Sequence, residues 1–338
     1  MNRRAYLGVD AGSISLNLVL LDADGAVLFE APYRRIEGNP VAAVGAGLRE
    51  LRATLPADVE IAAAGVTGSG RHLMAAVIGA DVVKNEISAH ARAAVHLHPD
   101  VQTIFEIGGQ DSKVTIIREG AVVDFAMNLV CAAGTGSFLD SQAKRLNLSI
   151  EAFAEMALRS RRPTAIAGRC TVFAESDMIH KQQIGHRQED IVMGLCHAMV
   201  RNFLGNVCRG KDIRPPVLLQ GGVSANPGIR RAFEEVLGYP VTVPERHLAM
   251  GAIGAAIFAA RAGAERSRFR GCAIGDRPVS TRGFECEDCA NRCEVVEIVD
   301  GEEIIGRTGG RCRKWEDTRG PREAGVLGKR SPSNVQRS

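Results

Sequence analysis

The chain has 338 residues, 45% of them hydrophobic, which is enough to bury the cores of about two domains. Its 42 basic and 39 acidic residues give a net charge of +3, which disfavours binding to nucleic acid or anionic membranes. No run approaches the ~18 apolar residues of a membrane span, and the residues before Tyr6 lack the apolar core of a signal peptide. We therefore expect a globular, cytoplasmic protein that binds neither nucleic acid nor membrane.

Strands that end in glycine turns recur along the chain. Residues 6–21 predict two strands around the turn Asp10-Ala-Gly12-Ser13. A similar pattern follows at 103–117, with the turn Gly108-Gly-Gln110-Asp111, and a third strand ends at Gly221-Gly222. The repetition predicts one fold unit present twice.

Helical patterns alternate with these strands, which is typical of an α/β fold. Small residues dominate 248–262 and would let a helix lie close to backbone or ligand. The helices are expected at 41–54, 87–96, 137–146, 150–160 and 191–208, and a further one begins after Asn226-Pro227.

The three glycine turns suit a polyphosphate, because glycine lets backbone N–H groups approach closely. Asp10 and Asp111 are placed to hold hydrated Mg²⁺ and to orient a water, and Gly221-Gly222 would let a base or ribose lie flat. Each turn alone fits a hairpin or a β-to-α connection equally well. The three in this order indicate a nucleotide site.

These turns resemble the phosphate-1, phosphate-2 and adenosine motifs of the superfamily of acetate and sugar kinases, Hsp70 and actin. The resemblance implies an α/β fold of two duplicated ribonuclease H-like lobes (actin/Hsp70-like) with ATP and Mg²⁺ in the cleft. Close relatives commonly carry a lysine where this chain has Asn17, so either Lys113 or another cation serves the phosphates, or none does. The expected catalytic residues are Asp10, Gln110 and Asp111; the expected ATP-binding residues are Gly12, Ser13, Ser15, Gly108, Gly109, Gly134, Thr135, Gly136, Gly221 and Gly222.

Two cysteines narrow the subclass. Cys131 precedes a glycine turn and a predicted helix, whose N-terminus would stabilise a thiolate, and Cys170 lies in Gly168-Arg-Cys-Thr. Taken alone, such distant cysteines are more often unrelated core residues. The run from Tyr6 to about Ala262, however, resembles the ATP-dependent activators of 2-hydroxyacyl-CoA dehydratases, a family that includes ATPase subunits of benzoyl-CoA reductases.

That resemblance implies a homodimer in which Cys131 and Cys170 of both subunits hold one [4Fe-4S] cluster. It implies an ATP-driven transfer of one electron, received from ferredoxin or flavodoxin, to a partner iron-sulfur dehydratase or reductase. Two alternatives stay open, namely a small-molecule or sugar kinase without a cluster and a nucleotide-switched scaffold. The expected organisation is a first lobe at 1–100, a second lobe with the cluster cysteines at 101–247, a helix returning to the cleft at 248–263, a cysteine-rich appendage at 264–317 and a disordered tail at 318–338.

Four further cysteines lie close together near the C-terminus, at Cys286, Cys289, Cys293 and Cys312. Thiols of a cytosolic protein are usually reduced, so metal ligation is a better explanation than disulfides. Their spacing suits structural zinc or a second iron-sulfur cluster without choosing between them. Cys196 and Cys208 lie in an apolar helical pattern, and we expect them to pack in the core.

Overall fold

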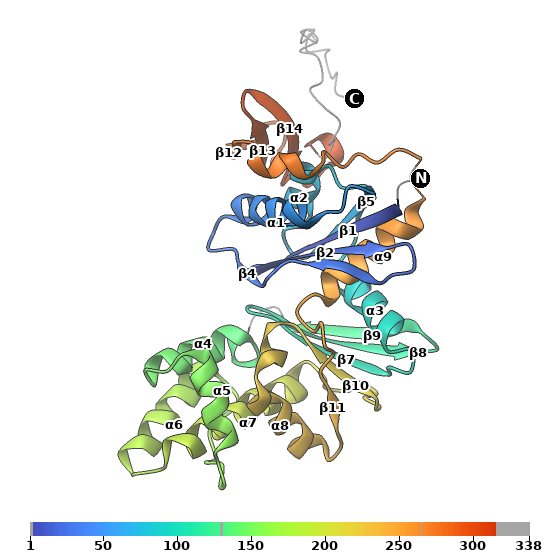
Figure 1. The fold of residues 1–338 in the computed structure, drawn as a ribbon. Helices are drawn as coiled ribbons and strands as arrows, with labels where there is room; N and C mark the ends of the chain where they lie inside the picture. Colours follow the sequence, from blue (N-terminus) through green and yellow to red (C-terminus); the bar gives the residue numbers. More distant parts are fainter. Residues whose placement is uncertain (1–2, 129–130, 264, 316–338) are drawn as a thin grey trace, which may run out of the picture. The chain divides into compact units, whose positions relative to one another are not determined.

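A computed structural model describes residues 3–128, 131–263 and 265–315 (Figure 1). The chain divides into two compact units, Met1–Asp276 and Arg277–Ser338, which we describe separately. The expected tail at 318–338 lies outside the described residues, and the finer boundaries expected before residue 263 stay predictions. Among the residues described, no helix has the length and apolar character needed to cross a membrane.

The first sheet of the larger unit is built around β1. Residues Ala5 to Ala11 of this strand are all buried, because it lies between an antiparallel neighbour, β2, and a parallel one, β5. The strand order is β3-β2-β1-β5-β6, with β4 paired to β2. The strands are β1 (Arg3–Ala11), β2 (Ser15–Asp22), β3 (Val27–Glu30), β4 (Arg34–Arg35), β5 (Val59–Thr67) and β6 (Val82–Val83).

The second sheet repeats this pattern around β7. Here β7 pairs antiparallel with β8 on one side and parallel with β10 on the other, in the order β11-β10-β7-β8-β9. Each sheet therefore starts with a strand, turns back through a glycine loop and continues by a crossover, as the repeat in the sequence predicts. Its strands are β7 (Thr103–Ile107), β8 (Ser112–Arg118), β9 (Ala121–Asn128), β10 (Val217–Gln220) and β11 (Val241–Thr242).

The helix α9 packs against the first sheet through its small residues. A Cβ added at Gly8 would lie 1.9 Å from the carbonyl oxygen of Ala252, and one at Gly65 would lie 2.2 Å from that of Ala255. Together with α3, α9 shares a buried cluster with residues of both sheets, among them Val19. In Figure 1, α1 and α2 lie on the other side of the first sheet. The bounds are α1 (Pro40–Thr54), α2 (Arg71–Ile78), α3 (Glu86–Leu97) and α9 (Met250–Ala262).

Helices of the second lobe surround a core centred on three phenylalanine rings. The rings of Phe105, Phe203 and Phe233 lie 5.2 to 5.7 Å apart. Cys196 and Cys208 are buried near this core, as expected, and burial raises the pKa of the Cys196 thiol to about 12. The bounds are α4 (Gly136–Arg145), α5 (Ile150–Leu158), α6 (Thr171–Gln183), α7 (Gln188–Asn206) and α8 (Pro227–Leu237), with short 3₁₀ turns η1 (Ala132–Gly134) and η2 (Gly222–Ala225). A further 3₁₀ turn, η3 (Cys272–Asp276), packs against α1 through Gly275 and Gly45.

The smaller unit is a three-stranded antiparallel sheet in the order β12-β13-β14. Its buried side chains include Val295, Ile298, Val299 and Ile305, together with Cys286. The elements are β12 (Val279–Glu285), β13 (Glu294–Asp300), β14 (Glu303–Thr308) and the 3₁₀ turn η4 (Arg313–Trp315).

Candidate nucleotide and thiolate sites

The glycine turns that are far apart in the sequence lie close together in the larger unit. A Cβ added at Gly109 would lie 2.3 Å from Cγ1 of Ile14, so the first and second turns are in contact. The backbone N–H of Gly136 donates to the carbonyl of Gly108 at 2.8 Å, and a Cβ at Gly136 would lie 3.1 Å from Val223. The three turns and the start of α4 therefore surround one space.

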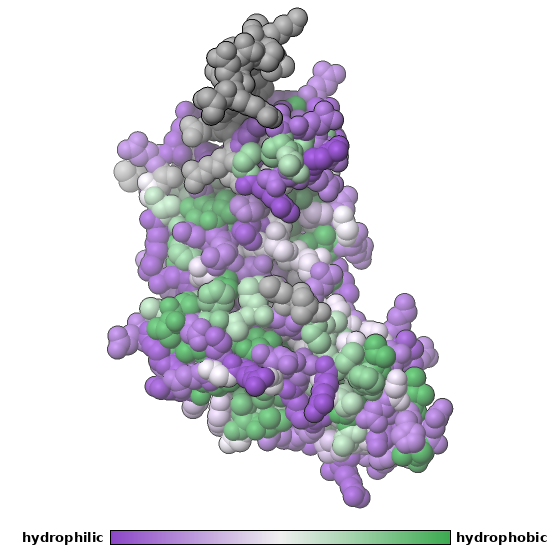
Figure 2. Space-filling model, turned by 180° about the vertical axis from the view of Figure 1, so that it is seen from behind, coloured by the Kyte–Doolittle hydropathy of each residue, from purple (hydrophilic) through white to green (hydrophobic). Residues whose placement is uncertain are grey.

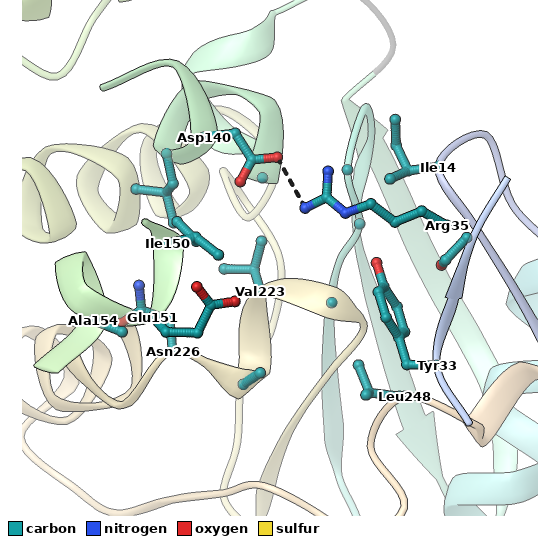
Figure 3. A pocket seen from close by; sticks show the side chains of 17 residues that line it. Ile14, Tyr33, Arg35, Asp140, Ile150, Glu151, Ala154, Val223, Asn226 and Leu248 are labelled. Carbon is teal, nitrogen blue, oxygen red and sulfur yellow. Dashed lines mark ion pairs between the residues drawn. The ribbon is translucent and has the colours of Figure 1, made fainter. Parts of the chain in front are cut away.

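That space is a cavity of about 370 Å³, within the range of small-molecule sites (Figure 3). Five of the expected ATP-binding residues line it, namely Ser15, Gly108, Gly109, Gly136 and Gly222. The other expected residues are not among those lining it: Asp10, Gly12, Ser13, Gln110, Asp111, Gly134, Thr135 and Gly221. Thr135 is fully buried, and its hydroxyl donates to the carbonyl of Ala132. This hydrogen bond stabilises the turn η1.

The third turn requires glycine at its first position. Gly221 has φ +86, and a Cβ there would lie 2.6 Å from the carbonyl oxygen of Ile107. Its N–H donates to the carbonyl of His247, and the Ser224 hydroxyl contacts Nδ1 of the same histidine at 2.7 Å. Helix α8 begins directly afterwards, with Asn226 capping the N–H of Gly228, as the sequence predicts.

An ion pair crosses the cavity and was not predicted from the sequence. Arg35 on β4 and Asp140 on α4 lie on opposite walls and point toward each other, at 3.6 Å (Figure 3). Tyr33 lies on the same side as Arg35, whereas Glu151 lies on the opposite wall (Figure 3). Isolated charged and aromatic residues of this kind carry no recognisable motif, because only the fold brings them to one cavity.

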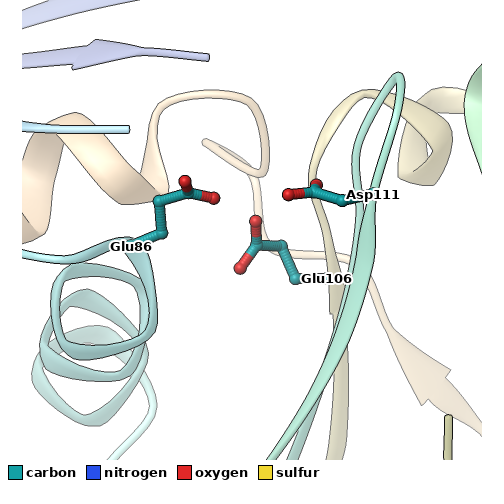
Figure 4. Close-up of side chains that lie close together, drawn as sticks. All are labelled: Glu86, Glu106 and Asp111. Atoms are coloured by element: carbon teal, nitrogen blue, oxygen red, sulfur yellow. The ribbon is translucent and has the colours of Figure 1, made fainter. Parts of the chain in front are cut away.

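Three carboxylates meet beside the second turn. Oxygens of Glu86, Glu106 and Asp111 lie within 4.8 Å of one another, a spacing that could hold a metal ion (Figure 4). However, Nζ of Lys113 lies 2.7 Å from Glu86, 3.0 Å from Glu106 and 2.9 Å from Asp111. The ammonium group also donates a hydrogen bond to Glu106. Lys113 is therefore the counterion of these three carboxylates.

The charge of Lys113 is secured by these neighbours. Burial opposes the charged form, but Glu106, Glu86 and Asp111 raise the pKa of Lys113 above its ordinary value. Asn17 stands where close relatives commonly carry a lysine, and it is the cross-strand partner of Asp10.

His90 connects this cluster to Asp10. Its Nε2 lies 3.7 Å from Oδ2 of Asp10 and 3.6 Å from Oε1 of Glu106. Burial would lower the pKa of His90, but the carboxylates of Glu106 and Asp10 raise it to about 9. With His90 and Lys113 both cationic, four carboxylates of the network leave a formal charge of −2, which suits one divalent cation. This net charge is compatible with the Mg²⁺ expected from the sequence beside Asp10 and Asp111.

We expect Gly251→Ala to impair ATP turnover by displacing Asp10. The added Cβ would lie 2.1 Å from Oδ2 of Asp10 and 2.9 Å from Nε2 of His90, and both atoms are side-chain ends that can move. Turnover should fall about a hundredfold if Asp10 acts as expected, and the melting temperature should fall too, because Asp10 and His90 are both buried. Steady-state ATPase assays and thermal denaturation measure the two effects. Gly205→Ala on α7 is the matched control, because nothing lies within 4 Å of its Cβ; equal losses in both variants would contradict the explanation.

Both expected cluster cysteines begin a helical segment. Cys131 precedes η1, and Cys170 is the residue before α6. The backbone N–H groups of Val172 and Phe173 lower the pKa of the Cys170 thiol, as a helix N-terminus does. Both cysteines are partly exposed, in contrast to the buried Cys196.

Two asparagines that the sequence analysis missed anchor the cysteine segments. Asn128 accepts a hydrogen bond from the N–H of Cys131, and its Nδ2 donates to the carbonyl of the same residue. Asn202, buried on α7, donates to the carbonyls of Gly168 and Arg169, and its Oδ1 would lie 3.1 Å from a Cβ at Gly134. The two cysteine segments therefore converge on α7.

Two exposed apolar residues follow Cys170 in the sequence. Val172 is 65% exposed and Phe173 is 66% exposed in the first turn of α6. Figure 2 shows that apolar residues (green) interrupt the polar surface of the molecule. Glu175 pairs with Arg145 of α4 at 2.8 Å, which ties α6 to α4.

Comparison with known proteins identifies the family. The sequence model of the BadF/BadG/BcrA/BcrD ATPase family matches residues 7–259. The chain belongs to this family. The match ends before the smaller unit begins, so the BadF/BadG/BcrA/BcrD assignment applies to the larger unit. The family expected from the three turns and the two cysteines is thus confirmed, and it makes the larger unit an ATPase.

Two relatives of known structure share this family fold. The (R)-2-hydroxyglutaryl-CoA dehydratase activating ATPase of Acidaminococcus fermentans is 34% identical over 261 residues, covering 75% of this chain and 96% of the relative. A crystal structure of that dehydratase's component A has a TM-score of 0.70 at 32% identity, covering 76% of this chain and 98% of the other. The activator of the 2-hydroxyisocaproyl-CoA dehydratase from Clostridium difficile was solved with bound ADPNP. Its structure has a TM-score of 0.69 at 31% identity, and the match covers 76% of this chain and 95% of the activator. The expected two-lobed fold is confirmed.

Proposed function

We propose that this protein is an ATP-dependent activator that passes one electron from a [4Fe-4S] cluster to a partner iron-sulfur enzyme, such as a 2-hydroxyacyl-CoA dehydratase or an aryl-CoA reductase. The observation that carries the proposal is the convergence of the Cys131 and Cys170 segments on Asn202, beside the cavity lined by Gly136. A nucleotide-driven change at Gly136 would reach Cys131 through a few residues of backbone. The activator names of both relatives support this role.

The chemistry of the two thiols fits a shared cluster. A [4Fe-4S] cluster takes four thiolates, and Cys131 and Cys170 supply two per chain, so two chains related by a two-fold axis complete the set. Exposed Val172 and Phe173 beside Cys170 are suited to bury apolar surface in such a homodimer. When bound, the cluster supplies one-electron chemistry, with ferredoxin or flavodoxin as the expected donor in the cytoplasm.

The chain's own groups have distinct tasks in this proposal. The glycine turns let the phosphates of ATP approach the backbone closely, and Gly221-Gly222 leave room for the nucleoside. Asp10, Gln110 and Asp111 bind Mg²⁺ or orient the attacking water, and His90 holds the carboxylate of Asp10 in place. Movement of the lobes breaks or makes the Arg35–Asp140 pair across the cavity.

Iron analysis of anaerobically purified protein tests the cluster. We expect about two iron atoms per chain in the wild type, because four are shared by two chains. Cys131→Ser and Cys170→Ser should both lose the iron and the brown colour while still binding ATP. Cys289→Ser in the smaller unit is the control and should keep the iron. A colourless wild-type monomer that hydrolyses ATP, or that phosphorylates a metabolite, would refute the proposal.

A further inference from the structure

Two cysteines of the smaller unit lie opposite each other at the end of a hairpin. The β12–β13 ladder pairs Glu285 with Glu294, and the next pair outward is Cys286 with Cys293. The N–H of Cys286 donates to the carbonyl of Cys293 at 2.8 Å, so the pairing continues. Side chains of directly opposite residues lie on one face, with Cβ atoms about 4.5–5.5 Å apart. Both sulfurs can therefore reach a single ion.

The segment after β14 brings a further cysteine to the same end of the sheet. Because β14 runs antiparallel to β13, its last residue, Thr308, lies opposite Val296. Gly309 then turns with φ +102, passing so close that a Cβ would lie 2.4 Å from the carbonyl oxygen of Glu294. Cys312 follows within this returning segment. Only a residue without a side chain allows that approach.

Hydrogen bonds to sulfur hold the returning segment against the hairpin. The N–H of Arg311 donates to Sγ of Cys293 at 3.5 Å, and Nε1 of Trp315 donates to Sγ of Cys286 at 3.3 Å. The Trp315 ring also packs edge-on against Phe284, with centroids 5.2 Å apart. N–H donors of this kind stabilise a sulfur that carries negative charge.

Cys289 completes the set from the tight turn of the hairpin. Its carbonyl accepts a hydrogen bond from the N–H of Arg292, whose φ is +42. The spacing from Cys286 to Cys289 is that of two ligands of one zinc ion. Among the described residues, no three of these sulfurs lie within 4.8 Å of one another, so binding one ion requires the thiols to come closer together.

The small core of the smaller unit favours such a link. Small cores are commonly supplemented by a metal ion, a disulfide or a partner. Four buried aliphatic side chains make up its core, Val295, Ile298, Val299 and Ile305. So small a core stabilises little on its own.

We propose that Cys286, Cys289, Cys293 and Cys312 bind one structural zinc ion, releasing their thiol protons to solvent. A single ion suits the hairpin better than a cluster, because Zn–S bonds of about 2.3 Å draw the sulfurs of opposite residues together, whereas a cubane spreads them apart. The zinc links the hairpin tip to the returning segment, and it is independent of the nucleotide and of the cluster at Cys131.

Metal analysis of the full-length protein tests this proposal. We expect about one zinc ion per chain in the wild type, and its loss in Cys286→Ser and Cys312→Ser. Iron content and ATP binding of the same samples report whether the larger unit stays folded. Cys272→Ser, which alters a buried cysteine of the larger unit, and Cys131→Ser should keep the zinc. Cobalt bound in place of zinc should give the visible absorption of a tetrahedral thiolate site in the wild type and in both control variants, but not in Cys286→Ser or Cys312→Ser.

Three results would overturn the zinc assignment. Wild-type protein without zinc, or zinc that stays in both C-terminal variants, would show that these thiols do not bind it. Iron that disappears in Cys286→Ser but not in Cys131→Ser would assign a second iron-sulfur cluster to this block. A thiol titration that finds these four cysteines oxidised in protein purified without oxygen would assign disulfides instead.

Discussion

Lys113→Met is expected to destabilise the folded protein by about 3 kcal/mol, because it leaves the buried carboxylate of Glu106 and two partly buried carboxylates without their counterion. The side chain of Lys113 is 1% exposed, and methionine would fill most of its volume, so the loss reports charge rather than packing. Urea unfolding followed by circular dichroism measures the change. Without the ammonium group, the negative charges of Glu86, Glu106 and Asp111 would repel one another. Its stability should therefore fall further as the pH rises and recover partly in mild acid.

Lys211→Met is the matched control for this experiment. Lys211 pairs with Asp124 near the surface, where water screens the charges, so its replacement should change stability far less. A loss in Lys113→Met no larger than in Lys211→Met would show that the buried network adds no net stability. Destabilisation that is equal at all pH values would show that carboxylate repulsion is not its cause.

Asp10→Asn is expected to lower ATP turnover at least about a hundredfold while leaving the iron bound. The substitution keeps the size of a side chain that is 9% exposed, but it removes the charge that faces His90 and that suits Mg²⁺. Steady-state ATPase assays and iron analysis on the same samples separate the two functions.

Asp24→Asn, in the exposed hairpin turn after β2, should retain normal turnover and is the control for Asp10→Asn. Iron lost together with turnover would mean that Asp10 supports the thiolate region as well as the nucleotide. Turnover that persists in Asp10→Asn would remove this residue from the catalytic set.

The glycine turns could be predicted because their function depends on local chemistry. A turn that needs φ > 0 or close backbone approach requires glycine at a fixed position, so Gly221 and Gly109 stand out in the sequence alone. The α/β class followed from the alternation of strands and helices, which is also a local pattern.

Helix α6 and the ionic network could not be predicted, because neither leaves a local pattern in the sequence. Val172 and Phe173 of α6 face solvent, so the helix lacks the apolar stripe that identifies a helix packed on a core. His90, Glu106 and Lys113 come from three different elements, and their spacing in the sequence carries no information about contact. Long-range side-chain networks emerge only after the sheets are assembled.

The buried network and the ion pair across the cavity differ greatly in what it takes to disrupt them. Separating Lys113 from three carboxylates would strand charges in the interior, whereas parting Arg35 from Asp140, both about half exposed, costs about 1 kcal/mol or less. When the lobes move relative to each other, we therefore expect the hinge to lie at the Lys113 network and the larger separation to occur between Arg35 and Asp140. A small displacement at the glycine turns would then become a larger one at Cys131 and Cys170.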